Sequence, residues 1–380
     1  MKSMLKSFEV ENFRGFQNRL KFDFKAGKYD FNSEMESDGV VKNAIVYGPN
    51  GIGKSALGLA IFDIILHLTD KRHFEPQRLL PYRNLNRAND LTSFKYVFTF
   101  DGDEVIYEYK KVDPLNLAWE RLELNGECLL ECDYSQPQNP YVKPGLVDNL
   151  NTNLSDGQLS LVKYIYKNTP TGTVAVVSKL VGFCENMLWY RSLSQGNEFA
   201  GHESVPMLLT EMLKKNGRIP DFEKFLSGFG LSYRLGFEQI NNQDVLFAYF
   251  EGGQKAPFES IASTGTSALY LFYCWSVSAF CNVSFLFIDE FDAFLHYEAA
   301  ETVVKLLNRQ PHFQTILTTH NTSLLSNEFS RPDCSFIMSR DNGKGEDVKI
   351  SSLPNLTERE IRKVHNLEKM YRAGAFSGNV

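Results

Sequence analysis

The sequence lacks the features that mark disulfide-stapled, membrane-spanning and repeat proteins. Its six cysteines are scattered over 380 residues without a CxxC pair, so it indicates neither a zinc site nor a disulfide framework, and we expect reduced thiols in a cytoplasmic protein. The longest apolar-rich run, Ser267 to Phe280, is short and interrupted by serine, which argues against a membrane span. Residues Met1 to Val10 contain no continuous apolar segment and do not resemble a signal peptide.

An excess of positive charge is also absent. The formal net charge of −6 argues against indiscriminate coating of nucleic acid, although it leaves room for a local basic groove. One basic cluster lies between Lys71 and Arg87, and it is either a solvated face or a contact surface for nucleic acid or an acidic partner. With 43% hydrophobic and 23% charged residues, the chain can form one large α/β domain with an insertion, or two domains.

Residues Gly48 to Ser55, which read Gly-Pro-Asn-Gly-Ile-Gly-Lys-Ser, match the P-loop pattern completely. The preceding residues Ala44 to Tyr47 are typical of a short buried strand, and Ser55 to Leu68 have the nearly continuous apolar pattern of a buried helix. The glycines therefore fall in a strand-to-helix turn, where backbone N–H groups can converge on phosphate oxygens. The alternative is a glycine-rich turn that binds nothing, but the lysine, the serine and both flanking elements argue against it.

This pattern assigns roles to individual side chains. The helix N-terminus adds partial positive charge to a phosphate site. Lys54 would reach the β- and γ-phosphates of a nucleotide, and the Ser55 hydroxyl would ligate Mg²⁺. The other nucleotide-binding positions that we assign to the loop are Gly48, Asn50, Gly51 and Gly53.

A second acidic motif completes the expected nucleotide site. Phe285 to Glu290 reads as an apolar strand that ends in two carboxylates, of which Asp289 would hold the Mg²⁺ shell and Glu290 would act as general base on the attacking water. Lys54 and Asp289 are 235 positions apart. Because a compact GTPase or AAA+ module would place these motifs much closer together, we expect a large insertion between them.

The segments around these motifs have mixed strand and helix patterns. We expect an N-terminal hairpin over Leu5 to Phe24 and a surface loop over Lys25 to Lys42. The expected later elements are three antiparallel strands (Phe94 to Phe100, Glu104 to Lys111, Trp119 to Leu124), two helical stretches (Leu154 to Leu193, Met207 to Gly230), a hairpin (Ser232 to Ile240 with Asp244 to Glu251), a helix (Thr266 to Phe280) and a strand (Thr315 to Thr319).

Several motifs occur in a fixed order across most of the chain: Asn12 to Phe16, Gly48 to Ser55, Ser263 to Thr266, Phe285 to Glu290, Asp292, and Thr318 to His320. In this order they resemble the ABC-type ATPases of the SMC, RecF and OLD group, and specifically the small AAA-family ATP-binding proteins of bacterial anti-phage defence. The resemblance implies an α/β fold: a P-loop ABC-type core with a mixed sheet flanked by helices, an antiparallel β subdomain and a helical insertion. We therefore expect an N-terminal half of the core in 1–133, a mainly helical insertion in 134–230, and a C-terminal half in 231–380.

The resemblance also implies roles outside the P-loop. Ser263 and Gly265 match the signature segment, which binds the γ-phosphate held by a second subunit, although this segment reads Ser-Thr-Gly-Thr where the family usually has two glycines and an acid. Asp292 matches the D-loop, and His320 matches the switch histidine that senses the γ-phosphate. Arg14 matches a position that approaches the nucleotide, with a surface arginine as the alternative. The glutamine-loop residue stays open among Gln77, Gln136, Gln138 and Gln158.

A signature that works across subunits implies a homo-oligomer built on head-to-tail dimers that enclose ATP and Mg²⁺. We expect an ATPase that acts as sensor or scaffold for a separate effector, a nuclease or toxin, in a defence system such as PARIS or Septu; DNA or a phage protein is a further partner. Only 60 residues follow His320 and they hold no DxD pair, so we expect no nuclease activity in this chain. The alternative is a RecF-like, ATP-dependent DNA-binding protein of repair or recombination. An ABC transporter subunit is a third, which would need a membrane partner.

Overall fold

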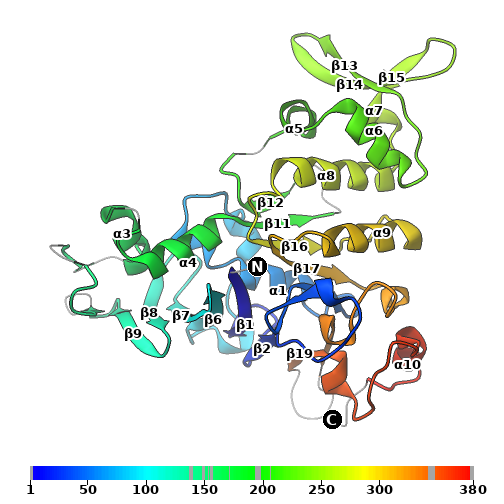
Figure 1. The fold of residues 1–380 in the computed structure, drawn as a ribbon. Coiled ribbons are helices and arrows are strands. Elements are labelled where there is room, and N and C mark those ends of the chain that lie inside the picture. Colours follow the sequence, from blue (N-terminus) through cyan, green and yellow to red (C-terminus); the bar gives the residue numbers. More distant parts are fainter. Residues whose placement is uncertain are drawn as a thin grey trace.

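The computed structural model describes residues 3–136, 140–147, 150–152, 154, 157–170, 172–192, 198–205, 207–340 and 347–376. Two seven-stranded sheets form its framework (Figure 1). One sheet is antiparallel and has the order β10-β9-β8-β7-β6-β1-β2. Its strands are β1 (Ser3–Glu11), β2 (Leu20–Asp23), β6 (Thr92–Phe100), β7 (Asp103–Lys111), β8 (Leu117–Leu124), β9 (Glu127–Asp133) and β10 (Tyr141–Val142).

The second, central sheet has the order β12-β11-β16-β17-β5-β18-β19. Its strands are β5 (Asn43–Tyr47), β11 (Met187–Arg191), β12 (Phe199–Gly201), β16 (Phe285–Asp289), β17 (Gln314–Thr319), β18 (Ser335–Arg340) and β19 (Val348–Ser352). The five inner strands are parallel, and only the edge strands β12 and β19 pair antiparallel. The carboxyl ends of β5, β17, β16 and β11 therefore lie along one edge of the sheet.

The inner strands β5, β11 and β16 are buried on both faces of the central sheet, which explains why they are nearly continuous apolar runs in the sequence. On β5, Ala44 and Val46 belong to one hydrophobic cluster, whereas Ile45 and Tyr47 belong to the other. This alternation follows the two-residue period of a strand. The sheet thus separates two cores, and each core is covered by its own helices.

The helices divide between these two cores. The first core contains α1 (Lys54–Ile61), α2 (Ile65–Leu68), α3 (Leu161–Asn168) and α4 (Ala175–Glu185), together with the antiparallel sheet. The second contains α5 (Leu209–Asn216), α6 (Ile219–Ser227), α7 (Phe258–Ile261), α8 (Thr264–Ser278), α9 (Tyr297–Asn308) and α10 (Leu367–Arg372). A three-stranded sheet of β13 (Leu235–Ile240), β14 (Gln243–Tyr249) and β15 (Lys255–Pro257) lies at the end of the molecule beyond α6 (Figure 1), and β3 (Glu36–Ser37) pairs with β4 (Val40–Val41).

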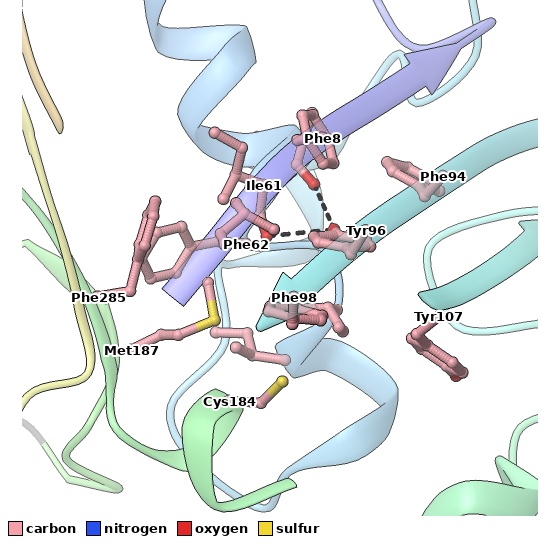
Figure 2. Packing of buried hydrophobic residues seen from close by; sticks show 14 of the residues in the cluster. Phe8, Ile61, Phe62, Phe94, Tyr96, Phe98, Tyr107, Cys184, Met187 and Phe285 are labelled. Atoms are coloured by element: carbon pink, nitrogen blue, oxygen red, sulfur yellow. Dashed lines mark hydrogen bonds between the residues drawn. The ribbon is translucent and has the colours of Figure 1, made fainter. Parts of the chain in front are cut away.

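Aromatic side chains join the antiparallel sheet to α1. Figure 2 shows Phe8 of β1 and Tyr96 of β6 next to Ile61 at the end of α1. The rings of Phe8 and Tyr96 have centroids 4.9 Å apart, and the Tyr96 hydroxyl donates to the backbone oxygen of Ala60 at 3.0 Å. The antiparallel sheet therefore supports the helix that follows the P-loop.

A buried ion pair fixes the same helix from its far end. Asp63, just after α1, accepts from Lys111 Nζ of β7 at 2.7 Å, and both side chains are at most 1% exposed. The hydroxyls of Tyr82 and Tyr109 also donate to this carboxylate, at 2.8 and 3.0 Å. Because a buried carboxylate is tolerated only when it is paired and hydrogen-bonded, the turn after α1 is strongly specified.

The structure confirms most of the expected strands and both expected hairpins. The N-terminal hairpin forms by pairing of β1 with β2, and β13 pairs with β14 in the second hairpin. The expected helix Thr266 to Phe280 is α8, which begins two residues earlier.

Three expectations are wrong in part. The helix expected over Ser55 to Leu68 is broken at 62–64 into α1 and α2, where Asp63 turns toward Lys111. The helical stretch expected up to Leu193 ends in the strand β11, which pairs in parallel with β16. The expected surface loop over Lys25 to Lys42 contains β3, β4 and a buried Met35.

Gly58 of α1 provides a test of how closely the P-loop helix packs on the central sheet. A Cβ atom at Gly58 would lie 2.7 Å from Cε1 of Phe287 and 2.9 Å from Nε1 of Trp189. We therefore expect Gly58→Ala to lower the free energy of unfolding by about 1–3 kcal/mol, because one of these rings must shift. Urea denaturation followed by circular dichroism measures the change.

The matched control is Gly182→Ala in α4, where nothing lies within 4 Å of the added Cβ. Alanine favours the helix at such a site by about 0.5–1 kcal/mol. The free energy of unfolding should therefore fall in Gly58→Ala and rise in Gly182→Ala. Equal changes in the two variants would contradict the close packing at Gly58.

Candidate functional site

The P-loop backbone needs glycine for two different reasons. Gly51 and Gly53 have φ angles of 78° and 113°, in the region that side chains disfavour. At Gly48, a Cβ atom would lie 3.1 Å from the backbone oxygen of Met338, so the loop packs tightly against β18. Asn50, also expected to bind nucleotide, is exposed on the loop, and Gly53 caps α1 without any side-chain hydrogen bond. The N–H groups of this turn are therefore positioned as an anion site requires.

Lys54 lies inside the loop. Its Nζ donates to the backbone oxygens of Gly48 at 2.6 Å and Pro49 at 3.0 Å, and the residue is only 6% exposed. Burial lowers the pKa of Lys54, while the charges of Glu290 and Asp289 oppose that change. The ammonium group is thus held by the loop backbone and lies close to the acidic pair Asp289 and Glu290.

Asp289 is where three distant segments meet. Its Oδ2 accepts from the Ser55 hydroxyl at 2.7 Å, and its Oδ1 accepts from the Thr318 hydroxyl at 2.8 Å. The carboxylate is fully buried; burial raises the pKa of Asp289, and the two hydroxyl donors oppose this rise. The structure therefore brings together Ser55 and Asp289, the two residues expected to hold Mg²⁺.

Glu290, the next residue, has a backbone φ of 51°, which is unusual for a residue with a side chain. Its N–H donates to the Thr318 hydroxyl at 2.8 Å, which holds the turn after β16 in place. Its Oε2 accepts from the guanidinium of Arg191 at 2.9 Å. The side chain of Glu290 is 22% exposed, so water can reach the carboxylate.

Sequence reasoning missed Arg191. It ends β11 and stands directly opposite Asp289 in the parallel register, but the sequence analysis assigned this segment to a helix. The available signal was the short run Met187 to Tyr190, which is apolar, rich in aromatics and of strand length. Such a run fits a buried strand as well as a helix, and only its pairing with β16 decides between them.

Asp292 and His320 lie close to the same edge of the sheet. Asp292 is 5% exposed, and burial raises its pKa, while the side chain of Thr319 and the charge of His320 oppose this change. His320 is exposed directly after the carboxyl end of β17. The two residues are therefore near each other and next to Thr318, which contacts Asp289.

Ser263 and Gly265 form the start of α8. The Ser263 hydroxyl accepts from the Thr266 N–H at 3.2 Å and caps the helix, while Ser263 itself stays exposed. A Cβ atom at Gly265 would lie 2.7 Å from the backbone oxygen of Phe294, so this glycine permits a close backbone approach. In the described part of the chain, no hydrogen bond or ion pair joins Ser263 or Gly265 to the P-loop of the same copy.

Arg14 does not contact the P-loop through any hydrogen bond or ion pair between described residues. Its guanidinium donates to the backbone oxygen of Arg78 at 2.8 Å, and its own backbone oxygen accepts from Asn84 at 2.7 Å. Burial lowers the pKa of Arg14, and the charge of Arg78 adds to this effect. Arg14 therefore anchors the basic segment around Arg78, and its expected approach to a nucleotide stays a prediction. The side chain of Gln77 lies outside the described residues.

The oxygen donors present suit a magnesium ion. Mg²⁺ takes one or two protein ligands and completes its shell with phosphate oxygens and water. The Ser55 hydroxyl and the Asp289 carboxylate supply such a pair. Across the described ranges, no cluster of three or more His, Cys, Asp or Glu could hold a metal without further ligands, and no helix is long and apolar enough to cross a membrane.

Comparisons with known proteins agree with an ATPase core. A family model described as "AAA domain, putative AbiEii toxin, Type IV TA system" matches residues 44–326. No curated protein matches the chain.

Solved structures of SMC head domains are also similar to the chain. The SMC head domain from Thermotoga maritima has 16% identity and a TM-score of 0.43, over 93% of this chain and 99% of that one. A second structure is a Smc head domain with an extended coiled coil, bound to the C-terminal domain of ScpA derived from Pyrococcus furiosus. It has 13% identity and a TM-score of 0.46, over 92% of this chain and 96% of that one. At TM-scores below 0.5, this likeness carries no inference about function.

Thr318 tests how strongly the site depends on its hydroxyl network. Thr318→Val removes the donor to Asp289 and the acceptor for the Glu290 N–H, and so leaves two polar groups without their partner. We expect a loss of about 1–3 kcal/mol in the free energy of unfolding, measured by urea denaturation.

Thr315→Val on the same strand is the control, because the Thr315 hydroxyl is buried without a hydrogen-bond partner. Its replacement should be neutral or stabilising. A loss at position 315 as large as that at position 318 would refute the assignment.

Proposed function

We propose that this chain, which belongs to the AAA-domain family whose model matches residues 44–326, is an ATPase that binds ATP with Mg²⁺ at its P-loop. The observation that carries the proposal is the pair of hydrogen bonds that Asp289 accepts from Ser55 and Thr318. These bonds join the P-loop helix, β16 and β17 at one edge of the central sheet. An α/β sheet binds its ligands at this kind of edge.

The proposed binding uses groups that the structure already positions. The N–H groups of the P-loop and the N-terminus of α1 would hold the phosphates, and Lys54 would exchange its contacts with Gly48 and Pro49 for phosphate oxygens. Ser55 and Asp289 would hold Mg²⁺, which neutralises phosphate charge when bound. The near-complete burial of Lys54 and Asp289 limits competition from water for both contacts.

For hydrolysis we assign Glu290 as the general base toward water. Its carboxylate is partly exposed, and its backbone is fixed by Thr318. His320, at the same edge, would sense the γ-phosphate, and Asp292, as the D-loop residue, would lie between two subunits.

The complete site, in this proposal, forms between two copies arranged head to tail. Ser263 and Gly265 begin a fifteen-residue helix and are separate from the P-loop in one copy, so their N–H groups can serve the nucleotide of a partner. ATP would then hold the copies together, and hydrolysis would release them.

The proposed switch would control a separate effector protein. The order of the motifs, which resembles that of the ATPases of bacterial anti-phage defence, supports a sensor or scaffold that controls a separate toxic effector. ATP hydrolysis stimulated by an effector protein supports this role. Stimulation by DNA with a steep salt dependence would instead favour the RecF-like alternative.

Calorimetry tests nucleotide binding directly. We expect wild-type protein to release or absorb heat on titration with ATP in Mg²⁺, and Lys54→Ala to weaken the affinity about 10- to 100-fold, since a charge-assisted contact to phosphate is lost. Lys214→Ala, which breaks only a surface pair with Asp244, should bind as wild type does. Absence of any binding heat in the wild type would end the proposal.

Glu290→Gln tests the two-copy site. The variant should bind ATP normally but hydrolyse it at least about 100-fold more slowly, so the ATP-bound dimer persists in size-exclusion chromatography with light scattering. Adding Lys54→Ala should return it to monomer, and Ser263→Arg should block dimers while ATP still binds. If ATP changes the measured mass of neither the wild type nor Glu290→Gln, the two-copy site is wrong.

A further inference from the structure

Arg191 places a cation between the two acidic residues of the site. Its guanidinium donates to Oε2 of Glu290 at 2.9 Å, and its Nε lies 3.6 Å from Oδ2 of Asp289. That Oδ2 is the same atom that accepts from the Ser55 hydroxyl. Arg191 therefore faces the pair of oxygens that is suited to Mg²⁺.

This position has a clear electrostatic reason. Asp289 is fully buried, and a buried carboxylate next to a second carboxylate is costly unless a cation compensates. Arg191 supplies that charge from the neighbouring strand, where its register with Asp289 fixes its place. The side chain of Arg191 is 30% exposed, so it can turn toward water without unfolding the strand.

Arg78 is a like charge that interacts with Arg191. Arg78 feels the positive charge of Arg191, which adds to burial in lowering the pKa of Arg78, while the charge of Asp289 opposes the change. Arg78 itself contacts Glu198, just before β12. The guanidinium of Arg191 is thus attracted by two carboxylates and repelled by one arginine, which makes its placement sensitive to any further cation.

We propose that Arg191 is a positioning residue that serves as an internal counter-ion for Asp289 and Glu290 and must be displaced by Mg²⁺ when the nucleotide binds. While the ion pair exists, the guanidinium of Arg191 competes with water for Oε2 of Glu290. Displacement of Arg191 would remove this competitor, so Glu290 would be a better general base toward water with Mg²⁺ bound than without it. The inference rests on the proposed ATPase function and adds a control step to the same site.

The decisive measurement is the Mg²⁺ concentration that gives half-maximal nucleotide binding, followed with a fluorescent ATP analogue. Arg191→Gln removes the competing charge, so the half-saturating Mg²⁺ concentration should fall about three- to tenfold. Arg191→Lys keeps the charge without the planar fork and should lie between this variant and the wild type. In metal-free buffer, the nucleotide-free Arg191→Gln protein should also unfold at a lower temperature, because Asp289 loses its counter-ion.

Arg121→Gln is the matched control. Arg121 is 37% exposed and pairs with Glu123 and Glu131 on the antiparallel sheet, away from the acids of the site. Its substitution should leave the Mg²⁺ requirement unchanged.

The outcomes separate this inference from the proposed function. If wild-type protein binds the analogue but neither Arg191 variant lowers the Mg²⁺ requirement, or if both raise it, Arg191 is not a competitor and the inference is wrong. If the wild type binds no nucleotide at any Mg²⁺ concentration, the proposed function itself fails. Should Arg191→Gln not fold, the comparison of Arg191→Lys with the wild type still decides.

Discussion

The structure of this site depends on one buried carboxylate. The side chain of Asp289 is fully buried and accepts hydrogen bonds from the hydroxyls of Ser55 in the P-loop helix and Thr318 in β17. Arg191 of β11 lies beside it. Each of these neighbours compensates part of the cost of burying an acid. Because the partners come from segments far apart in the sequence, the carboxylate also fixes how the helix and three parallel strands are arranged at the edge of the sheet.

The site lies where two hydrophobic cores meet. The P-loop helix belongs to the core of the antiparallel sheet, whereas α8 and α9 belong to the core on the opposite face. Phe285 and Phe287 face the first core, and Leu286 and Ile288 face the second. The strand that ends in Asp289 is therefore packed on both faces, which fixes the position of the acidic pair.

The sequence pattern predicts those elements that a short motif and a regular apolar period define. The P-loop, the strand that ends in Asp289 and the helix after Ser263 were predictable, since each combines a short motif with a clear period. Arg191 was not predictable, because the apolar run of four residues before it becomes a strand only through pairing with β16, whose sequence lies about a hundred positions away. The break after α1 has the same origin, since the partner of Asp63 is Lys111 on the antiparallel sheet. The expected roles of Ser263, Gly265 and Arg14 toward a nucleotide stay predictions.

The close approach of Gly265 to the backbone of Phe294 has a mechanical consequence. The gap at this point is too small for even one methyl group, so the first turn of α8 and the segment after Asp292 have no room to slide past each other. A shift of the segment that links the acidic pair to Phe294 would therefore also displace the exposed start of α8. A change inside the molecule can in this way alter the shape of a surface that another molecule would touch, without any loosening of the core.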